Sequence, residues 1–350
     1  MNVEPIKGRG ASDNPGNRFE KIRLEYDRDE ETGQKPPPER LLMKDHSSGI
    51  ISTNKSPDIG FHKSLNPYRG CEHGCIYCYA RPTHEFLGMS AGLDFESKIV
   101  VKHDAPDLLR KTLSQRSWIP DVIVMSGVTD PYQPVEKELE ITRGCLKVLA
   151  GSRHPVSIIT KNHLVTRDLD LLSELAAYHA VSVTLSVTTL DPELARVMEP
   201  RTTRPGRRIE AVRKLSEAGI PVRVNVAPVI PGLTDHECVS ILEAAASAGA
   251  CGAGYTMLRL PYGVKDLFLQ WLDQHFPDRK QKVVNRLLDI RSGKLNRSEY
   301  GERFRGRGHY AGQVADLFQQ TVSRLNLNRG PGGLSSEAFR RPAQGQLDLF

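Results

Sequence analysis

Apolar residues recur in two patterns along the chain, and together the patterns predict strands that alternate with helices. Short runs rich in apolar and β-branched residues are typical of buried strands. They cover residues 61–65, 98–102, 122–125, 156–159, 181–185, 222–226 and 253–258. Segments with helical spacing lie between them, at residues 105–115, 136–150, 167–178, 207–218 and 235–248. This alternation predicts an α/β fold in which a parallel sheet is connected by right-handed crossovers.

The two ends of the chain differ from this alternating region, which we place at residues 56–262. Residues 1–55 are polar and lack sustained apolar periodicity, so we expect an extended or disordered arm. Residues 263–325 hold three more segments with helical spacing, at 264–275, 281–291 and 311–325, which predict a helical C-terminal extension able to cover the open side of a barrel. Residues 326–345 are rich in Gly, Pro, Ser and Arg and predict a linker before the last five residues, 346–350.

The composition limits the class of protein but does not identify its function. A chain of 350 residues with 39% hydrophobic content can bury one large core, as a single-domain α/β barrel does. Its 48 Lys and Arg against 42 Asp and Glu give a net charge of +6, which permits a nucleic-acid partner without requiring one. No run approaches the roughly 18 apolar residues of a membrane span, and the first residues lack the apolar core of a signal peptide. We therefore expect a cytoplasmic protein without a membrane partner.

Three cysteines share one short loop with the spacing C-x3-C-x2-C: Cys71, Cys75 and Cys78. Three thiolates on such a loop can hold three corners of an iron–sulfur cluster and leave one iron open to an exchangeable ligand, which suggests catalysis. The alternative is a structural zinc site, which needs a fourth ligand such as His73 or His84. The clustering of half the six cysteines within eight residues favours the iron–sulfur interpretation over incidental thiols.

This loop resembles the signature of the radical S-adenosylmethionine (SAM) superfamily, in which C-x3-C-x2-C binds a 4Fe–4S cluster and SAM chelates the open iron. The residue before the third cysteine is normally aromatic there, and Tyr77 fits. The resemblance implies a partial (β/α)6, TIM-like barrel with its chemistry at the C-terminal ends of the strands. It also implies that SAM is cleaved reductively to a 5′-deoxyadenosyl radical, with electrons from a donor such as flavodoxin or ferredoxin.

The residues just after the expected strands are the candidates for SAM binding. By position, Thr129 and Asp130 would replace the Gly-Gly-Glu turn with which the family receives the methionine ammonium, although both also suit a turn and helix cap. Lys161 would pair with the SAM carboxylate or belong to a solvated loop. Ser186 aligns with a SAM-contacting serine of the DNA photoproduct lyase branch, or is an inert serine within a strand.

Arginines and tyrosines complete the candidate site. Of the arginines that follow residue 200, we expect Arg201 to lie inside and contact SAM, and Arg204, Arg207 and Arg208 to lie on the surface. Tyr79 and Tyr132 stand beside the cysteine loop and the expected SAM turn, which makes them candidate catalytic radical relays. Tyrosines more often pack cores than carry radicals, so this role is weighed against simple packing.

Within the superfamily, residues 60–260 resemble uncharacterised relatives of spore photoproduct lyase, the DNA repair photolyase-like branch. The motifs that carry this resemblance are the cysteine loop, the Thr-Asp-Pro-Tyr-Gln-Pro at 129–134, Thr160-Lys161 and the Glu-Pro-Arg-Thr at 199–202. That lyase has a hydrogen-donating cysteine where this chain has Gly127-Val128, so we do not expect photoproduct reversal by the same route. Our hypothesis is a bacterial, lyase-like radical SAM enzyme of DNA repair. The alternatives are radical modification of RNA or protein, and a non-catalytic metal-binding module that recognises nucleic acid.

The last five residues, Gln-Leu-Asp-Leu-Phe, closely resemble the peptide by which bacterial repair and replication proteins dock on the DNA sliding clamp. Gln346 can both donate and accept hydrogen bonds, and Leu347, Leu349 and Phe350 could each contribute roughly 1.5–3 kcal/mol when buried in a pocket. The alternative is a terminal turn that folds back on the barrel. This tail is the feature of the sequence that most favours DNA over RNA or protein as the partner.

Overall fold

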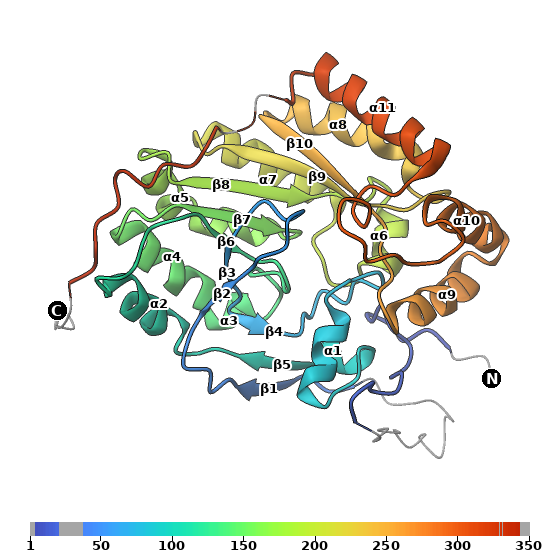
Figure 1. Cartoon of the computed structure of the whole chain (residues 1–350), viewed down its shortest axis with the longest axis horizontal. Coiled ribbons are helices and arrows are strands. Elements are labelled where there is room, and N and C mark those ends of the chain that lie inside the picture. Colours follow the sequence, from blue (N-terminus) through green and yellow to red (C-terminus); the bar gives the residue numbers. More distant parts are fainter. Residues whose placement is uncertain (1–3, 21–37, 329, 331, 344–350) are drawn as a thin grey trace.

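The computed structural model describes residues 4–20, 38–328, 330 and 332–343. Its main sheet has seven strands in the order β10-β9-β8-β7-β6-β3-β2, of which all but β2 run parallel (Figure 1). The strands are β2 (Ile51–Thr53), β3 (Lys63–Leu65), β6 (Ile123–Met125), β7 (Val156–Thr160), β8 (Val181–Ser186), β9 (Val222–Val229) and β10 (Gly252–Met257). Six parallel strands with helical crossovers confirm the predicted partial (β/α)6 barrel.

Helices cover the outer face of this sheet (Figure 1). The main ones are α2 (Ala105–Ser114), α4 (Ile141–Gly151), α5 (Leu169–Ala176), α7 (Pro205–Glu217) and α8 (Cys238–Ser247). Short helices precede or join them: η1 (Arg81–Leu87), α1 (Leu93–Ser97), α3 (Glu136–Leu139), η2 (His163–Asp168), α6 (Pro192–Met198) and η3 (Asp235–Glu237). The single helix predicted at 136–150 is two helices, because Glu140 takes a left-handed conformation with φ of 51° that ends α3.

A second, three-stranded sheet lies beside the barrel in the order β1-β5-β4. It is formed by β1 (Leu41–Lys44), β5 (Lys98–Val101) and β4 (Tyr68–Arg69), so the apolar run at 98–102 is a strand outside the barrel. The expected extended or disordered arm contains ordered pieces within residues 4–20 and 38–55. These residues are mostly extended, but two pieces join sheets as β1 and β2, and Ala11 and Ile50 are buried.

The C-terminal extension is helical, as predicted, with α9 (Val264–His275), α10 (Pro277–Ile290) and α11 (Gly308–Arg324). The segment between α10 and α11, rather than the helices, connects the two edges of the barrel. The Met257 N–H of β10 donates to the Phe304 carbonyl at 2.8 Å, and Arg303 forms an ion pair with Asp58, which follows β2. Among the described residues, no helix is both long and apolar enough to span a bilayer.

Residues 332–343, part of the predicted linker, lie along the end of the barrel where the strands begin (Figure 1). The Ser335 N–H donates to the His179 carbonyl at 2.9 Å just before β8, and the Arg340 N–H to the Ser152 carbonyl at 2.8 Å just before β7. The Phe339 ring packs edge-on against another ring, His154, at 5.4 Å. This part of the chain is therefore held on the barrel, in contrast to the free linker we expected. Residues 346–350 lie outside the described residues.

Candidate active site

The cysteine loop connects β4 to η1 beside the C-terminal ends of the barrel strands (Figure 1). Cys71 and Cys75 are buried, Cys78 is partly exposed, and none of the three forms a disulfide. Burial raises the pKa of each thiol, and for Cys71 the nearby Asp130, Cys78 and Cys75 raise the pKa further. The three thiols therefore lie within eight consecutive residues of one loop, 71–78, and the other two contribute to the raised pKa of Cys71.

A buried arginine fixes the shape of this loop. Arg81, which is fully buried, donates from Nε to the Cys75 carbonyl at 3.0 Å and from Nη2 to the Gly74 carbonyl at 3.1 Å. Its charge is balanced by Glu96, 2.5 Å away, whose other contacts include the backbone N–H of Ala11 at 2.8 Å. Gly74 has a φ of 65°, and a Cβ there would meet Glu96 Oε2 at 2.8 Å, so the loop needs glycine at this point.

The donor set fits an iron–sulfur cluster. Thiolates are the protein ligands that such clusters take, and three unpaired thiols are gathered here on a loop held by Arg81. The two histidines considered for zinc have other contacts: His73 lies 3.4 Å from Asp130, and His84 Nε2 lies 2.9 Å from the Lys98 carbonyl.

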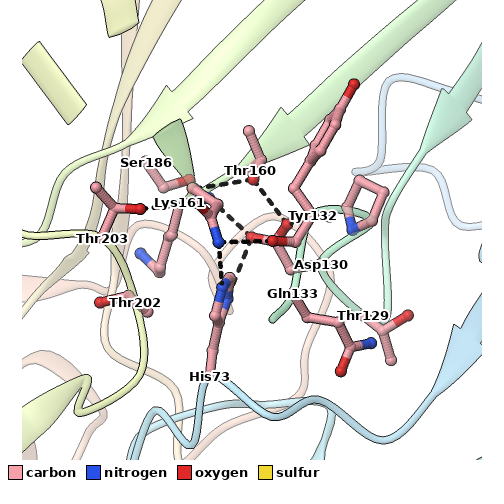
Figure 2. Close-up of polar contacts among 12 residues, drawn as sticks. His73, Thr129, Asp130, Tyr132, Gln133, Thr160, Lys161, Ser186, Thr202 and Thr203 are labelled. Carbon is pink, nitrogen blue, oxygen red and sulfur yellow. Dashed lines mark hydrogen bonds and ion pairs between the residues drawn. The ribbon is translucent and has the colours of Figure 1, made fainter. Parts of the chain in front are cut away.

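Asp130 joins the cysteine loop to the ends of β6 and β7 (Figure 2). Its Oδ1 accepts from the Tyr132 N–H at 2.9 Å and the Thr160 hydroxyl at 2.7 Å. Its Oδ2 accepts from the Lys161 N–H at 2.7 Å and lies 3.4 Å from His73 Nδ1. Burial opposes ionisation, but His73 and these hydrogen bonds hold the pKa of Asp130 below its usual value. The carboxylate is already fully engaged, so Asp130 positions its neighbours.

Lys161 points across the barrel from the end of β7. Its Nζ donates to the Ala227 carbonyl at 2.9 Å and the Thr188 hydroxyl at 3.2 Å, and lies 3.3 Å from Glu199 Oε1. Burial, followed by the nearby Arg208, lowers the pKa of this ammonium to about 8. Lys161 is thus a barrel-lining cation rather than a solvated loop lysine, and a buried carboxylate balances its charge.

The arginines correct one sequence-based expectation. Arg208, which we expected on the surface, is fully buried and ion-paired with Glu199, and its Nη1 donates to the Ser186 carbonyl at 3.1 Å. The reason is tertiary, because helix α7 directs Arg208 inward against the end of β8. Arg201 is the more open of the two, with its side chain 35% exposed and its Nη1 3.4 Å from Glu72 Oε1 in the cysteine loop.

Of the remaining predicted residues, two lie at the candidate site and one holds the neighbouring turn in place. The buried Tyr77 hydroxyl contacts Glu199 and lies 3.1 Å from the Thr188 hydroxyl, beside Lys161. Ser186 is buried at the end of β8. Thr129 is also buried, and its hydroxyl donates to the Tyr68 carbonyl at 2.9 Å, which ties the turn to the strand before the cysteine loop.

The two candidate relay tyrosines have different surroundings. Tyr79 directly follows Cys78, is 50% exposed, and donates from its hydroxyl to the Gly127 carbonyl at 2.6 Å. Tyr132 is fully buried, and its ring points away from His73 (Figure 2). Its hydroxyl donates to Asp168 at 3.0 Å, and burial followed by this carboxylate raises its pKa. The structure therefore brings Tyr79, but not the phenol of Tyr132, to the mouth of the barrel.

Sequence analysis missed several residues that build the site. Glu199 and Arg81 were not selected, and His73 was considered only as a zinc ligand. Each lies close to a motif in the sequence, but a charged residue near a motif is usually solvated, and only its burial reveals its role. The position of His73 between Cys71 and Cys75, and that of Glu199 at the start of the Glu-Pro-Arg-Thr motif, were the available signals.

Comparisons with known proteins agree with this geometry. A sequence model of the Radical SAM superfamily matches residues 65–245. An uncharacterised protein of Mycobacterium tuberculosis is 36% identical over 300 residues, covering 84% of this chain and 85% of that protein. An uncharacterised protein of Methanocaldococcus jannaschii is 34% identical over 198 residues, covering 57% of this chain and 71% of that protein.

Among solved structures, spore photoproduct lyase has a similar fold. A variant of that enzyme with bound AdoMet and dinucleoside spore photoproduct gives a TM-score of 0.57 at 15% identity, covering 81% of this chain and 78% of the lyase. Another variant of that enzyme, with a single substitution, gives a TM-score of 0.56 at 16% identity, covering 82% of this chain and 80% of the lyase. At this level of identity the likeness concerns the fold.

Proposed function

The chain belongs to the radical SAM superfamily, and from this premise we propose that it uses radical chemistry on a nucleic acid, in DNA repair. It is an enzyme, and the cofactors of its family are a 4Fe–4S cluster and SAM. The observation that carries the proposal is the set of three unpaired thiols, two of them buried, on a loop held by Arg81 at the C-terminal end of a parallel barrel. When bound, the two cofactors supply a 5′-deoxyadenosyl radical that removes a hydrogen atom from a C–H bond.

In this proposal Cys71, Cys75 and Cys78 hold the cluster. Lys161 and Ser186, at the ends of neighbouring strands β7 and β8, bind SAM from the barrel interior, with Lys161 attracting its carboxylate. Tyr77 lines the same region, and Arg201 reaches it through Glu72. Thr129 and Asp130 support the SAM-binding turn through their contacts with Tyr68 and Lys161.

Replacement of Lys161 by alanine is expected to weaken SAM binding while the cluster is retained. The change removes a charge-assisted hydrogen bond, which typically contributes about 1.5–3 kcal/mol, or roughly a 10- to 150-fold change in Kd. Equilibrium binding to the reconstituted, unreduced protein measures the change, and iron content reports the cluster. Lys147→Ala, on the exposed side of α4, is the matched control. Equal SAM affinity in Lys161→Ala and this control would remove Lys161 from the binding site.

Tyr79 is the candidate for a radical relay, because it follows Cys78 and lies partly open at the barrel mouth. The loop at Gly127-Val128 that receives its hydroxyl has no cysteine, so hydrogen return by a thiol at that turn is not available. We therefore do not propose photoproduct reversal by that cysteine-dependent route.

The choice of a DNA substrate is supported by the fold shared with spore photoproduct lyase, the net positive charge and the terminal peptide. The reconstituted, reduced enzyme tests this choice: with SAM present, formation of 5′-deoxyadenosine is compared on damaged DNA, RNA and protein fractions. Product that carries a DNA modification supports the proposal. Modification of RNA or protein alone would support the alternative radical SAM functions, for which an electron donor such as flavodoxin or ferredoxin is equally needed.

We also propose that residues 346–350 dock on a bacterial sliding clamp, which would place the enzyme on DNA in the cytoplasm. A peptide of residues 340–350 should bind the clamp, and the paired change Leu349→Ala and Phe350→Ala should abolish binding because it removes both apolar anchors. Calorimetry with the peptide and pull-down with the whole protein measure this. If the whole protein shows no clamp binding, the proposal of a DNA substrate loses this support. The proposed radical chemistry is unaffected.

A further inference from the structure

The loop that follows β10 carries an arginine that forms no ion pair with any described residue. Arg259 lies between two aromatic rings, with its guanidinium carbon 5.6 Å from the centroid of Tyr79 and 4.9 Å from that of Phe304. Its Nε is buried and has no hydrogen-bond partner among the described residues. Because a guanidinium has five N–H donors, stacking on two rings leaves its hydrogen-bonding capacity unused.

The carboxylate that acts on Arg259 is shared with a second arginine. Asp58, the nearby carboxylate, is already engaged by Arg303, whose Nε donates to it at 2.8 Å. Arg303 itself adds positive charge, and burial followed by Arg303 lowers the pKa of Arg259. A partly buried cation in such surroundings is stabilised when an external anion binds beside it.

A basic pocket begins at the next residue of the same loop. It has a volume of about 460 Å³ and is lined in part by Leu260, Tyr262, Lys265 and Lys294. Both lysines are exposed and, within the part of the chain that the structure describes, neither forms an ion pair; the acidic Glu299 nearby is paired with Arg297 at 2.5 Å. The Tyr262 ring is 60% exposed and carries Arg18 at 3.6 Å from its centroid.

We propose that this loop binds a single nucleic-acid strand at the barrel mouth, with one phosphate at Arg259 and the adjoining nucleotide in the pocket of Tyr262, Lys265 and Lys294. This inference rests on the proposed function and adds the site through which the substrate enters. Phosphate binding uses the unpaired cations, and exposed rings such as Tyr262 and Tyr79 provide surfaces on which unpaired bases stack. Accessible rings and flanking cations favour a single strand, since the bases of a duplex are already stacked on one another.

The position of Tyr79 connects this surface to the chemistry. Tyr79 follows the cluster ligand Cys78, contacts Arg259 through its ring, and donates to the Gly127 carbonyl at the end of β6. A strand anchored by Arg259 therefore passes next to the cysteine loop. The site at β10 and the radical source then lie on the same end of the barrel.

Binding of a fluorescently labelled single-stranded oligonucleotide to the anaerobically reconstituted holoenzyme tests the site. For single strands, the slope of log K against log salt is about −0.7 per phosphate neutralised. Arg259→Gln is expected to reduce the magnitude of the slope by about 0.7, and the exposed pair Lys265→Gln with Lys294→Gln by up to about 1.4. Tyr262→Ser is expected to weaken binding about 5-fold or more with the slope unchanged, because it removes stacking and no charge.

Matched controls remove the same charge at the other end of the barrel. Arg153, which lies 4.0 Å from the Tyr178 ring, precedes β7, and Lys111 and Lys147 are exposed on α2 and α4. Arg153→Gln and the pair Lys111→Gln with Lys147→Gln should keep the wild-type slope. The site is overturned if the wild type binds the oligonucleotide and the loop variants bind with unchanged affinity and slope, or if the controls change equally. A wild-type holoenzyme that binds neither single-stranded DNA nor RNA overturns the nucleic-acid substrate itself.

Discussion

Replacement of Cys71, Cys75 or Cys78 by alanine is expected to abolish stable binding of the 4Fe–4S cluster and, with it, all reductive cleavage of SAM. Two thiolates leave two of the four irons without a protein ligand, so the cluster becomes labile. After anaerobic reconstitution, the wild type should hold about four irons per chain, and each variant far fewer. Iron analysis, the visible absorption spectrum and 5′-deoxyadenosine formation measure the effect.

The chain provides a control for the loss of a thiol. Cys251 is partly exposed and lies outside the cysteine loop, where its sulfur contacts the Val222 carbonyl at 3.2 Å. Cys251→Ser should keep the iron content and the activity of the wild type. A Cys75→Ala protein that retained a complete, SAM-responsive cluster would contradict the ligand assignment.

Replacement of Glu199 by leucine is expected to destabilise the protein by about 3–5 kcal/mol, because removal of one member of a buried ion pair leaves the other charge without compensation. Glu199 and Arg208 are both fully buried, and Lys161 lies 3.3 Å from the same carboxylate. The hydroxyl of Thr188 also loses the acceptor to which it donates at 2.7 Å. Urea unfolding followed by circular dichroism measures the change where unfolding is reversible.

Helix α6, which ends just before Glu199, supplies a surface pair for comparison. Glu193 on α6 pairs with Arg196 at 2.9 Å, but both side chains are largely exposed. Glu193→Leu should therefore change stability by no more than about 1 kcal/mol. The double change Glu199→Leu with Arg208→Leu should recover part of the loss, since it removes the stranded guanidinium. If Glu199→Leu were as stable as Glu193→Leu, the buried network would not be a source of stability.

The repeating architecture was predictable because it rests on local patterns. The apolar runs that became β6, β7, β8 and β9 are short, rich in branched side chains, and separated by segments of helical spacing. The run at 98–102 has the same composition, yet it pairs with Leu41–Lys44 in the small sheet. Its composition shows that it is a strand, but not which neighbour supplies its hydrogen bonds.

The segments that departed from expectation share a physical feature. Residues 38–55 and 332–343 are polar and lack periodicity, and they bind largely through backbone groups and single side chains, as in the bonds from Ser335 and Arg340. Backbone hydrogen bonds are available to almost any sequence, so composition alone does not distinguish a segment held on a surface from a free one.

By itself, the sequence determined the alternation of strands and helices, the loop with three cysteines, and the placement of Lys161 and Ser186 at strand ends, because these depend on the spacing of residues close together in the chain. The tertiary structure decided which charges are buried and with which partners. Asp130 is directed to His73, 57 positions before it in the numbering, Arg208 is turned inward to Glu199, and Arg259 lies between two rings and forms no ion pair with any described residue. The cost of burying a charge depends on the groups that the whole fold brings around it, and these come from distant parts of the chain.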